Sequence, residues 1–139
     1  MARGQEKWIP CSQFLLLLNA PRDASSGQAT GRRQWSPIVV TKEWGAASPQ
    51  ILSAASTNEV LPLVEFEFLR SGPTGVEQVF QTVTLTNATI STFKQYIGFP
   101  DAGEQSNPHP LEDVSFTFQK IEVTNNEGRT AASDEWTTR

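Results

Sequence analysis

The sequence has a single cysteine and a single histidine among its 139 residues, Cys11 and His109. One cysteine excludes an intramolecular disulfide, and one histidine excludes a histidine-rich metal site. Counting alone leaves a nucleophilic pair of Cys11 and His109 open, but neither residue lies in the sequence context of a nucleophile. The prolines on both sides of His109 favour a structural turn, and the apolar segment around Cys11 favours a buried thiol.

Long apolar runs are also missing, and so is an excess of basic residues. The longest purely apolar run, residues 14–18, is far shorter than the roughly 20 residues of a membrane-spanning helix, so we expect no membrane insertion. The segment before it does not resemble a secretory signal peptide. The formal net charge of −4 argues against general nucleic-acid binding.

The charges that are present are unevenly distributed. Residues 1–42 carry a net charge of +4, whereas residues 99–139 carry −5. Opposite charges of this kind attract each other within one fold or between stacked copies of a chain. Ordinary solvation of surface charges explains the same pattern, so both interpretations stay open.

The sequence is rich in Val, Ile and Thr, which make up 29 of the 139 residues and favour β-strands. The segment 8–18 alternates poorly, which predicts a strand covered on both faces. In the segment 112–124 the apolar positions change parity, which predicts a bulge or bend near Gln119 and Lys120. In all, the apolar pattern predicts strands at 8–18, 37–43, 63–70, 77–86, 88–97 and 112–124, with an edge strand carrying Trp136 at 130–138.

One short helix is expected at 49–56, with Ser48 as its N-cap and Pro49 at its first position. A helix this short is not stable alone and must pack on a sheet. Its expected apolar face consists of Ile51, Leu52 and Ala55. We therefore expect a mainly β fold in one domain, residues 1–139, forming a small β-barrel or two-sheet sandwich with one short flanking α-helix.

Two segments are expected to be loops, residues 19–36 and 99–111. The first is unusually long, and loops of that length are often functional. No phosphate-binding glycine loop, nucleophile elbow or metal-spaced cluster occurs, so we expect no catalytic residue, metal or cofactor. Glu65 and Glu67 share one strand face and could serve glycoside hydrolysis, although a solvated strand face gives the same pattern more often.

Several stretches taken together resemble one protein family. Thr41-Lys42-Glu43 followed by Ser48-Pro49 forms one of them, and Ser115-Phe116-Thr117-Phe118-Gln119-Lys120-Ile121 forms another. On these residues the sequence, from about Trp8 onward, resembles the hemolysin-coregulated protein (Hcp) family. That family forms the inner tube of bacterial type VI secretion systems.

The resemblance implies a β-barrel of two sheets with one flanking helix. It also implies homohexameric rings that stack head to tail into a tube, and a structural rather than enzymatic role. The implied partners are other copies of the chain, a contractile sheath, a spike protein and secreted effectors carried in the lumen. The implied location is the bacterial cytoplasm, followed by export through the secretion apparatus. The family has an extra strand before the segment at Trp8, which we expect here to be absent or shortened.

By analogy, the long loop matches the family's extended loop, which reaches the next ring. We expect its basic residues to meet acidic residues at the strand edges of the adjacent ring. The stacking loop is expected to use Arg22, Asp23, Arg32, Arg33 and Trp35, and its acidic partners to be Glu112, Asp113 and Asp134. Two alternatives remain: an effector carrier or effector-like relative that does not stack, and, more remotely, a small β-barrel hydrolase using Glu65 and Glu67.

Overall fold

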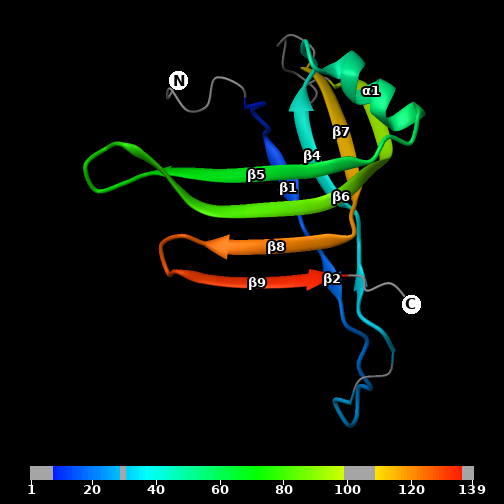
Figure 1. Cartoon of the computed structure of the whole chain (residues 1–139), viewed down its shortest axis with the longest axis vertical. Helices are drawn as coiled ribbons and strands as arrows, with labels where there is room; N and C mark the ends of the chain where they lie inside the picture. The colour runs from blue at the N-terminus through cyan, green and yellow to red at the C-terminus, as the bar shows by residue number, and fades with distance from the viewer. Residues whose placement is uncertain (1–7, 29–30, 99–108, 136–139) are drawn as a thin grey trace, which may run out of the picture. The chain divides into compact units, whose positions relative to one another are not determined.

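The computed structural model describes residues 8–28, 31–98 and 109–135 (Figure 1). The chain divides into two compact units. Unit 1 comprises Met1–Pro10, Asn58–Thr89 and Phe118–Arg139, and unit 2 comprises Cys11–Thr57 and Ile90–Thr117. The long strand β6 (Glu77–Gly98) contributes its first part to unit 1 and its second part to unit 2.

Unit 2 is built on antiparallel strand pairs and carries the helix. Strand β4 (Ile38–Glu43) lies between β1 (Gln13–Leu15) and β7 (His109–Thr117), and β7 is hydrogen-bonded to β6 on its other side. A separate ladder joins β2 (Leu18–Asn19) to β3 (Gln34–Trp35). Helix α1 (Ser48–Ser56) follows β4. The buried side chains of the unit include Ile38 and Val40 of β4, Val114 and Phe116 of β7, Ile90 of β6 and Ala54 of α1.

Unit 1 contains an antiparallel sheet in the order β5-β6-β8-β9, with β5 (Leu61–Ser71), β8 (Lys120–Asn125) and β9 (Thr130–Glu135). In Figure 1 these strands lie side by side. Burial alternates along β6, because Val83 and Leu85 are fully buried and the threonines between and beside them are half-buried. This period-two pattern is the one that predicted the strand. Ile121 of β8 is buried in the same unit.

The expected fold class, mainly β with one short helix, is confirmed. The expected strand at 63–70 is β5, extended at both ends, and those at 77–86 and 88–97 are one strand, β6. The predicted break near Gln119 and Lys120 is confirmed, because β7 ends at Thr117 and β8 begins at Lys120. The last expected strand is β9, whereas residues 136–138, including Trp136, lie outside the described residues.

The N-terminal prediction was wrong in two respects. Residues 8–18 do not form one strand, because only β1 and the first residue of β2 are extended and paired. They are not covered on both faces either, since Leu15, Leu17 and Leu18 are 57%, 51% and 43% exposed. The expected loop at 19–36 ends in β3, because residues 34–35 find hydrogen-bonding partners in β2. The expected loop at 99–111 ends earlier too, because β7 begins at His109.

The helix lies where it was predicted, but Ser48 is not its N-cap. Ala47 occupies the N-cap position without a side-chain hydrogen bond, and Ser48 is buried in the first turn. The expected apolar face is only partly confirmed. Ile51 and Ala55 are half-buried, Leu52 is 52% exposed, and Ala54 is buried instead.

Asn87 has an unusual backbone conformation within β6, and this conformation can be tested by substitution. Its φ of 52° lies in the left-handed region, and its side-chain amide donates to Gln119 Oε1 at 2.7 Å. Glycine adopts this conformation without strain. A β-branched residue held in it is strained by about 1–3 kcal/mol. We therefore expect Asn87→Val to lower the free energy of unfolding, measured by urea denaturation, clearly more than Asn87→Gly. Equal stability of the two variants would contradict this account.

Candidate assembly residues

The five expected stacking-loop residues come from one segment of unit 2, between β2 and the end of β3. Arg22, Arg32 and Arg33 are exposed, whereas Trp35 is half-buried in β3 opposite Leu18. Figure 1 shows that this segment runs past the β2–β3 ladder, away from the end of the unit that carries α1. The segment therefore presents three guanidinium groups at the surface of the isolated chain.

Asp23 is the acidic member of the five, and its carboxylate is engaged in the loop itself. Its Oδ2 accepts hydrogen bonds from Ser25 Oγ at 2.9 Å, from Ser26 N at 2.9 Å and from Ser26 Oγ at 2.7 Å. The bonds from Ser26 and Ser25 lower the pKa of Asp23, since they stabilise its ionised form. The Asp23 carboxylate therefore organises a turn.

The expected acidic partners differ from one another in their surroundings. Asp134 is half-buried in β9. Asp113 is half-buried in β7, where Thr41 Oγ1 donates to its Oδ1 at 2.8 Å and the Tyr96 hydroxyl donates at 3.2 Å. Desolvation and then the Asp113 charge raise the pKa of Tyr96. Glu112 is fully buried, so the expectation that it lies at an exposed strand edge was wrong. The reason is that β7 is an interior strand between β4 and β6.

Glu112 forms a buried ion pair with Lys42 of β4, which sequence reasoning did not identify. Lys42 Nζ lies 2.6 Å from Glu112 Oε2, and the side chains are 5% and 0% exposed. The same ammonium group donates to the Glu43 carbonyl at 2.8 Å. The sequence feature that could have indicated this pair is a lysine within the mainly apolar strand β4, because a buried charge requires a partner of opposite charge.

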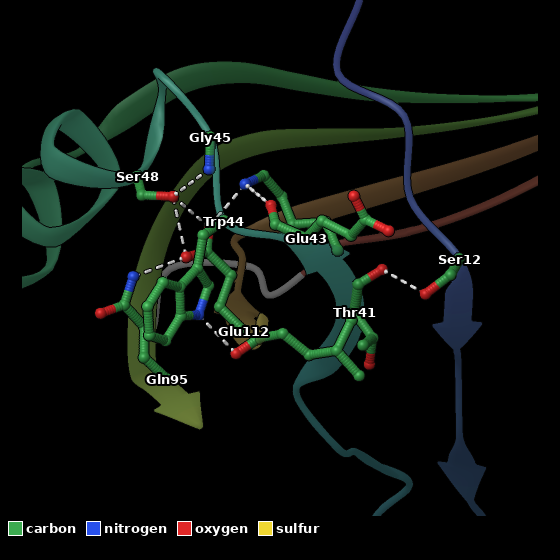
Figure 2. Close-up of polar contacts among 10 residues, drawn as sticks. Ser12, Thr41, Glu43, Trp44, Gly45, Ser48, Gln95 and Glu112 are labelled. Atoms are coloured by element: carbon green, nitrogen blue, oxygen red, sulfur yellow. Dashed lines mark hydrogen bonds and ion pairs between the residues drawn. The ribbon is translucent and has the colours of Figure 1, made fainter. Parts of the chain in front are cut away.

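Two further side chains complete the polar cluster around this pair (Figure 2). Ser48 Oγ lies 2.8 and 3.0 Å from the two Glu112 oxygens and accepts a hydrogen bond from Gly45 N at 3.0 Å. Gln95 Nε2 donates to Glu112 Oε1 at 2.9 Å. Burial alone would raise the pKa of Glu112, but the bonds from Lys42, Gln95 and Ser48 and the Lys42 charge lower it overall. The cluster thus links the first turn of α1 to β4, β6 and β7.

Other expected site residues are placed as follows. Cys11 is exposed, so the expectation of a buried thiol was wrong, and partial desolvation raises the pKa of this thiol. Glu65 is exposed and Glu67 is half-buried on β5. Within the described ranges, no group of three or more His, Cys, Asp and Glu residues could hold a metal ion. No helix among the same residues is long and apolar enough to cross a membrane.

The buried ion pair gives the second prediction. Removing one member of a buried pair leaves an uncompensated charge and costs about 3–5 kcal/mol. We therefore expect Glu112→Gln to lower the free energy of unfolding at neutral pH by that amount. The exposed pair of Arg70 and Glu127, with side chains 54% and 52% exposed, is the matched control. There, Glu127→Gln should cost no more than about 1 kcal/mol.

The difference between wild type and Glu112→Gln should depend on pH. Because the folded-state pKa of Glu112 lies below its ordinary value of 4.5, the ionised group contributes its full stability above that value. The contribution is lost as the pH falls through the lower folded-state pKa. Urea unfolding between pH 7 and pH 3 should show the two curves converging on the acid side. A difference that stays constant or grows on acidification would contradict the assignment.

Comparisons with known proteins agree with this fold. The family described as "Type VI secretion system effector, Hcp" matches residues 1–124. The "Major exported protein" of Pseudomonas aeruginosa is 39% identical over 134 residues, which cover 96% of this chain and 77% of that protein.

Solved structures give the same result. A crystal structure of an Hcp protein superposes with a TM-score of 0.84 at 27% identity, covering 97% of this chain and 81% of that one. The secreted protein Hcp3 of Pseudomonas aeruginosa gives a TM-score of 0.72 at 29% identity, covering 93% of this chain and 76% of that one. The chain therefore belongs to the Hcp family of type VI secretion system proteins.

Proposed function

We propose that this Hcp protein is a subunit of a type VI secretion tube, in which hexameric rings stack head to tail and carry effectors in their lumen. The observation that carries the proposal is the family match over residues 1–124. In this account the whole chain acts as one structural domain, and the chemistry of the tube is recognition between copies rather than catalysis.

The open strand edges support self-association. In the described part of the chain, β1 pairs with β4, β5 with β6, and β9 with β8, so each of β1, β5 and β9 has one free edge. Strands β5 and β9 carry charged residues, which discourage unspecific pairing. Strand β1 has no charged residue and ends in Leu15, and the exposed Leu17 and Leu18 follow after the half-buried Leu16. An uncharged apolar edge of this kind is stabilised when a neighbouring subunit covers it.

The exposed guanidinium groups support stacking between rings. Arg22, Arg32 and Arg33 lie on one solvent-exposed segment, where carboxylates of an adjacent ring can reach them. Asp113 and Asp134 are the proposed carboxylates, because they are half-buried whereas Glu112 is fully buried in its own unit. Half-buried Trp35 adds an amphipathic contact at the base of the segment.

Export and the remaining partners follow from the same proposal. A relative is named for its export, and we propose that this chain is made in the cytoplasm and leaves through the type VI apparatus. The sheath, the spike protein and the effectors would be its partners there. The hydrolase alternative with Glu65 and Glu67 is not proposed, because membership of this family favours a structural role.

One observation favours the alternative of an effector carrier that does not stack. Of the three acidic residues expected to hold the next ring, Glu112 is buried and Asp113 already accepts two hydrogen bonds from its own chain. Stacking then depends on fewer accessible carboxylates than the charge distribution indicated. A chain of this kind would form single rings and bind effectors without growing tubes.

Charge reversal separates the two functions. We expect the double variant Arg22→Glu, Arg32→Glu to abolish tubes seen by negative-stain electron microscopy and to leave the mass of the single ring unchanged. The reason is that the reversed charges repel the acidic surface of the next ring. Arg129→Glu, which reverses an exposed charge in the turn between β8 and β9, is the control and should leave tube growth intact. Unchanged tubes in the double variant would contradict stacking through this loop.

A further inference from the structure

The stacking loop contains a small closed turn that the sequence did not reveal. Asp23 N donates to the Gln28 carbonyl at 2.7 Å, and Gly27 N donates to the Asp23 carbonyl at 2.8 Å. Gly27 has a φ of 75°, which a residue with a side chain adopts only at a cost. The backbone of residues 23–28 therefore closes on itself.

The Asp23 carboxylate is hydrogen-bonded to the residues that follow it in this turn. A single oxygen, Oδ2, accepts from the Ser25 hydroxyl, the Ser26 hydroxyl and the Ser26 amide at 2.7–2.9 Å. These are charge-assisted hydrogen bonds, which are stronger than neutral ones. Residues 24–28 are all exposed, so the turn has no hydrophobic core of its own to hold it. The hydrogen bonds to the Asp23 carboxylate, together with the two backbone bonds, hold the turn in its conformation.

The order of this turn matters for Arg22, which directly precedes Asp23. Fixing the backbone of a residue costs conformational entropy. A loop that orders only on contact with the next ring bears this cost during association, whereas a loop ordered in advance does not. A pre-formed turn therefore strengthens the contact between Arg22 and the next ring, although the turn itself does not contact that ring.

We propose that Asp23 is a positioning residue: its carboxylate pre-forms the turn at residues 23–28 and thereby sets Arg22 for recognition of an acidic surface on a second copy of the chain. The inference rests on the proposed stacking function and deepens it. It replaces the expectation that Asp23 itself contacts the adjacent ring.

Three variants of the full chain test this proposal: Asp23→Ala, Asp23→Asn and Glu77→Ala. Glu77 is an exposed residue at the start of β6, so Glu77→Ala controls for the loss of one negative charge elsewhere on the surface. The readout is the protein concentration at which rings stack, measured by sedimentation across a series of salt concentrations. We expect Asp23→Ala to raise this concentration about tenfold, equivalent to about 1.4 kcal/mol. Asp23→Asn should stay near wild type, because its amide oxygen still accepts from Ser26.

The salt dependence distinguishes positioning from direct contact. Asp23→Ala and Asp23→Asn lose the same charge, so under the positioning account they should share one slope of stacking against salt, whereas Arg22→Glu with Arg32→Glu should alter that slope far more. Hydrogen exchange should rise at residues 23–28 in Asp23→Ala and stay low in Asp23→Asn.

Each other outcome has one meaning. If Asp23→Asn weakens stacking as much as Asp23→Ala while hydrogen exchange at residues 23–28 stays low, the charge itself makes the contact and the positioning role is overturned. If the arginine variant loses stacking while Asp23→Ala behaves like wild type, the positioning role is overturned and the proposed function stands. If the wild-type rings do not stack at any concentration, or the arginine variant stacks normally, the stacking function fails and the positioning role fails with it.

Discussion

The buried ion pair of Lys42 and Glu112 constrains unit 2 more than any other contact described above. Two charges removed from water are tolerated only when their remaining donors and acceptors are bonded, and Ser48, Gln95 and the Glu43 carbonyl meet that requirement. Helix α1 depends on the same network, because it has no side-chain N-cap and no acidic residue in its first turn. The cluster therefore links the first turn of α1 to β4, β6 and β7.

The charged residues of unit 2 include a buried pair inside the fold and exposed residues at its surface. Lys42 and Glu112 are used inside the fold, whereas Arg22 and Arg32 are exposed and available to other molecules. Three basic residues of the first third, Arg22, Arg32 and Arg33, lie on an exposed loop with a turn that Asp23 organises. In an Hcp protein such a loop suits recognition between copies, since charge pairs across an interface select orientation as well as adding affinity.

The strands were largely predictable, because burial on one face leaves a period of two, as at Val83 and Leu85. The break before Lys120 was predictable for the same reason, since the parity of the apolar residues changes there. The cluster was not predictable in this way, because Lys42 and Glu112 are far apart in the sequence and become neighbours only through the β4–β7 register. Ser48 was assigned as an N-cap because local patterns say nothing of an acceptor on a distant strand.

The central claim is that this Hcp chain assembles with copies of itself. The most direct measurement is its mass in solution, by light scattering coupled to size-exclusion chromatography over a range of protein concentrations. The account predicts the mass of a hexameric ring, because the uncharged β1 edge and the exposed leucines beside it are then covered by a neighbouring subunit. A monomer mass that persists at every concentration would contradict it.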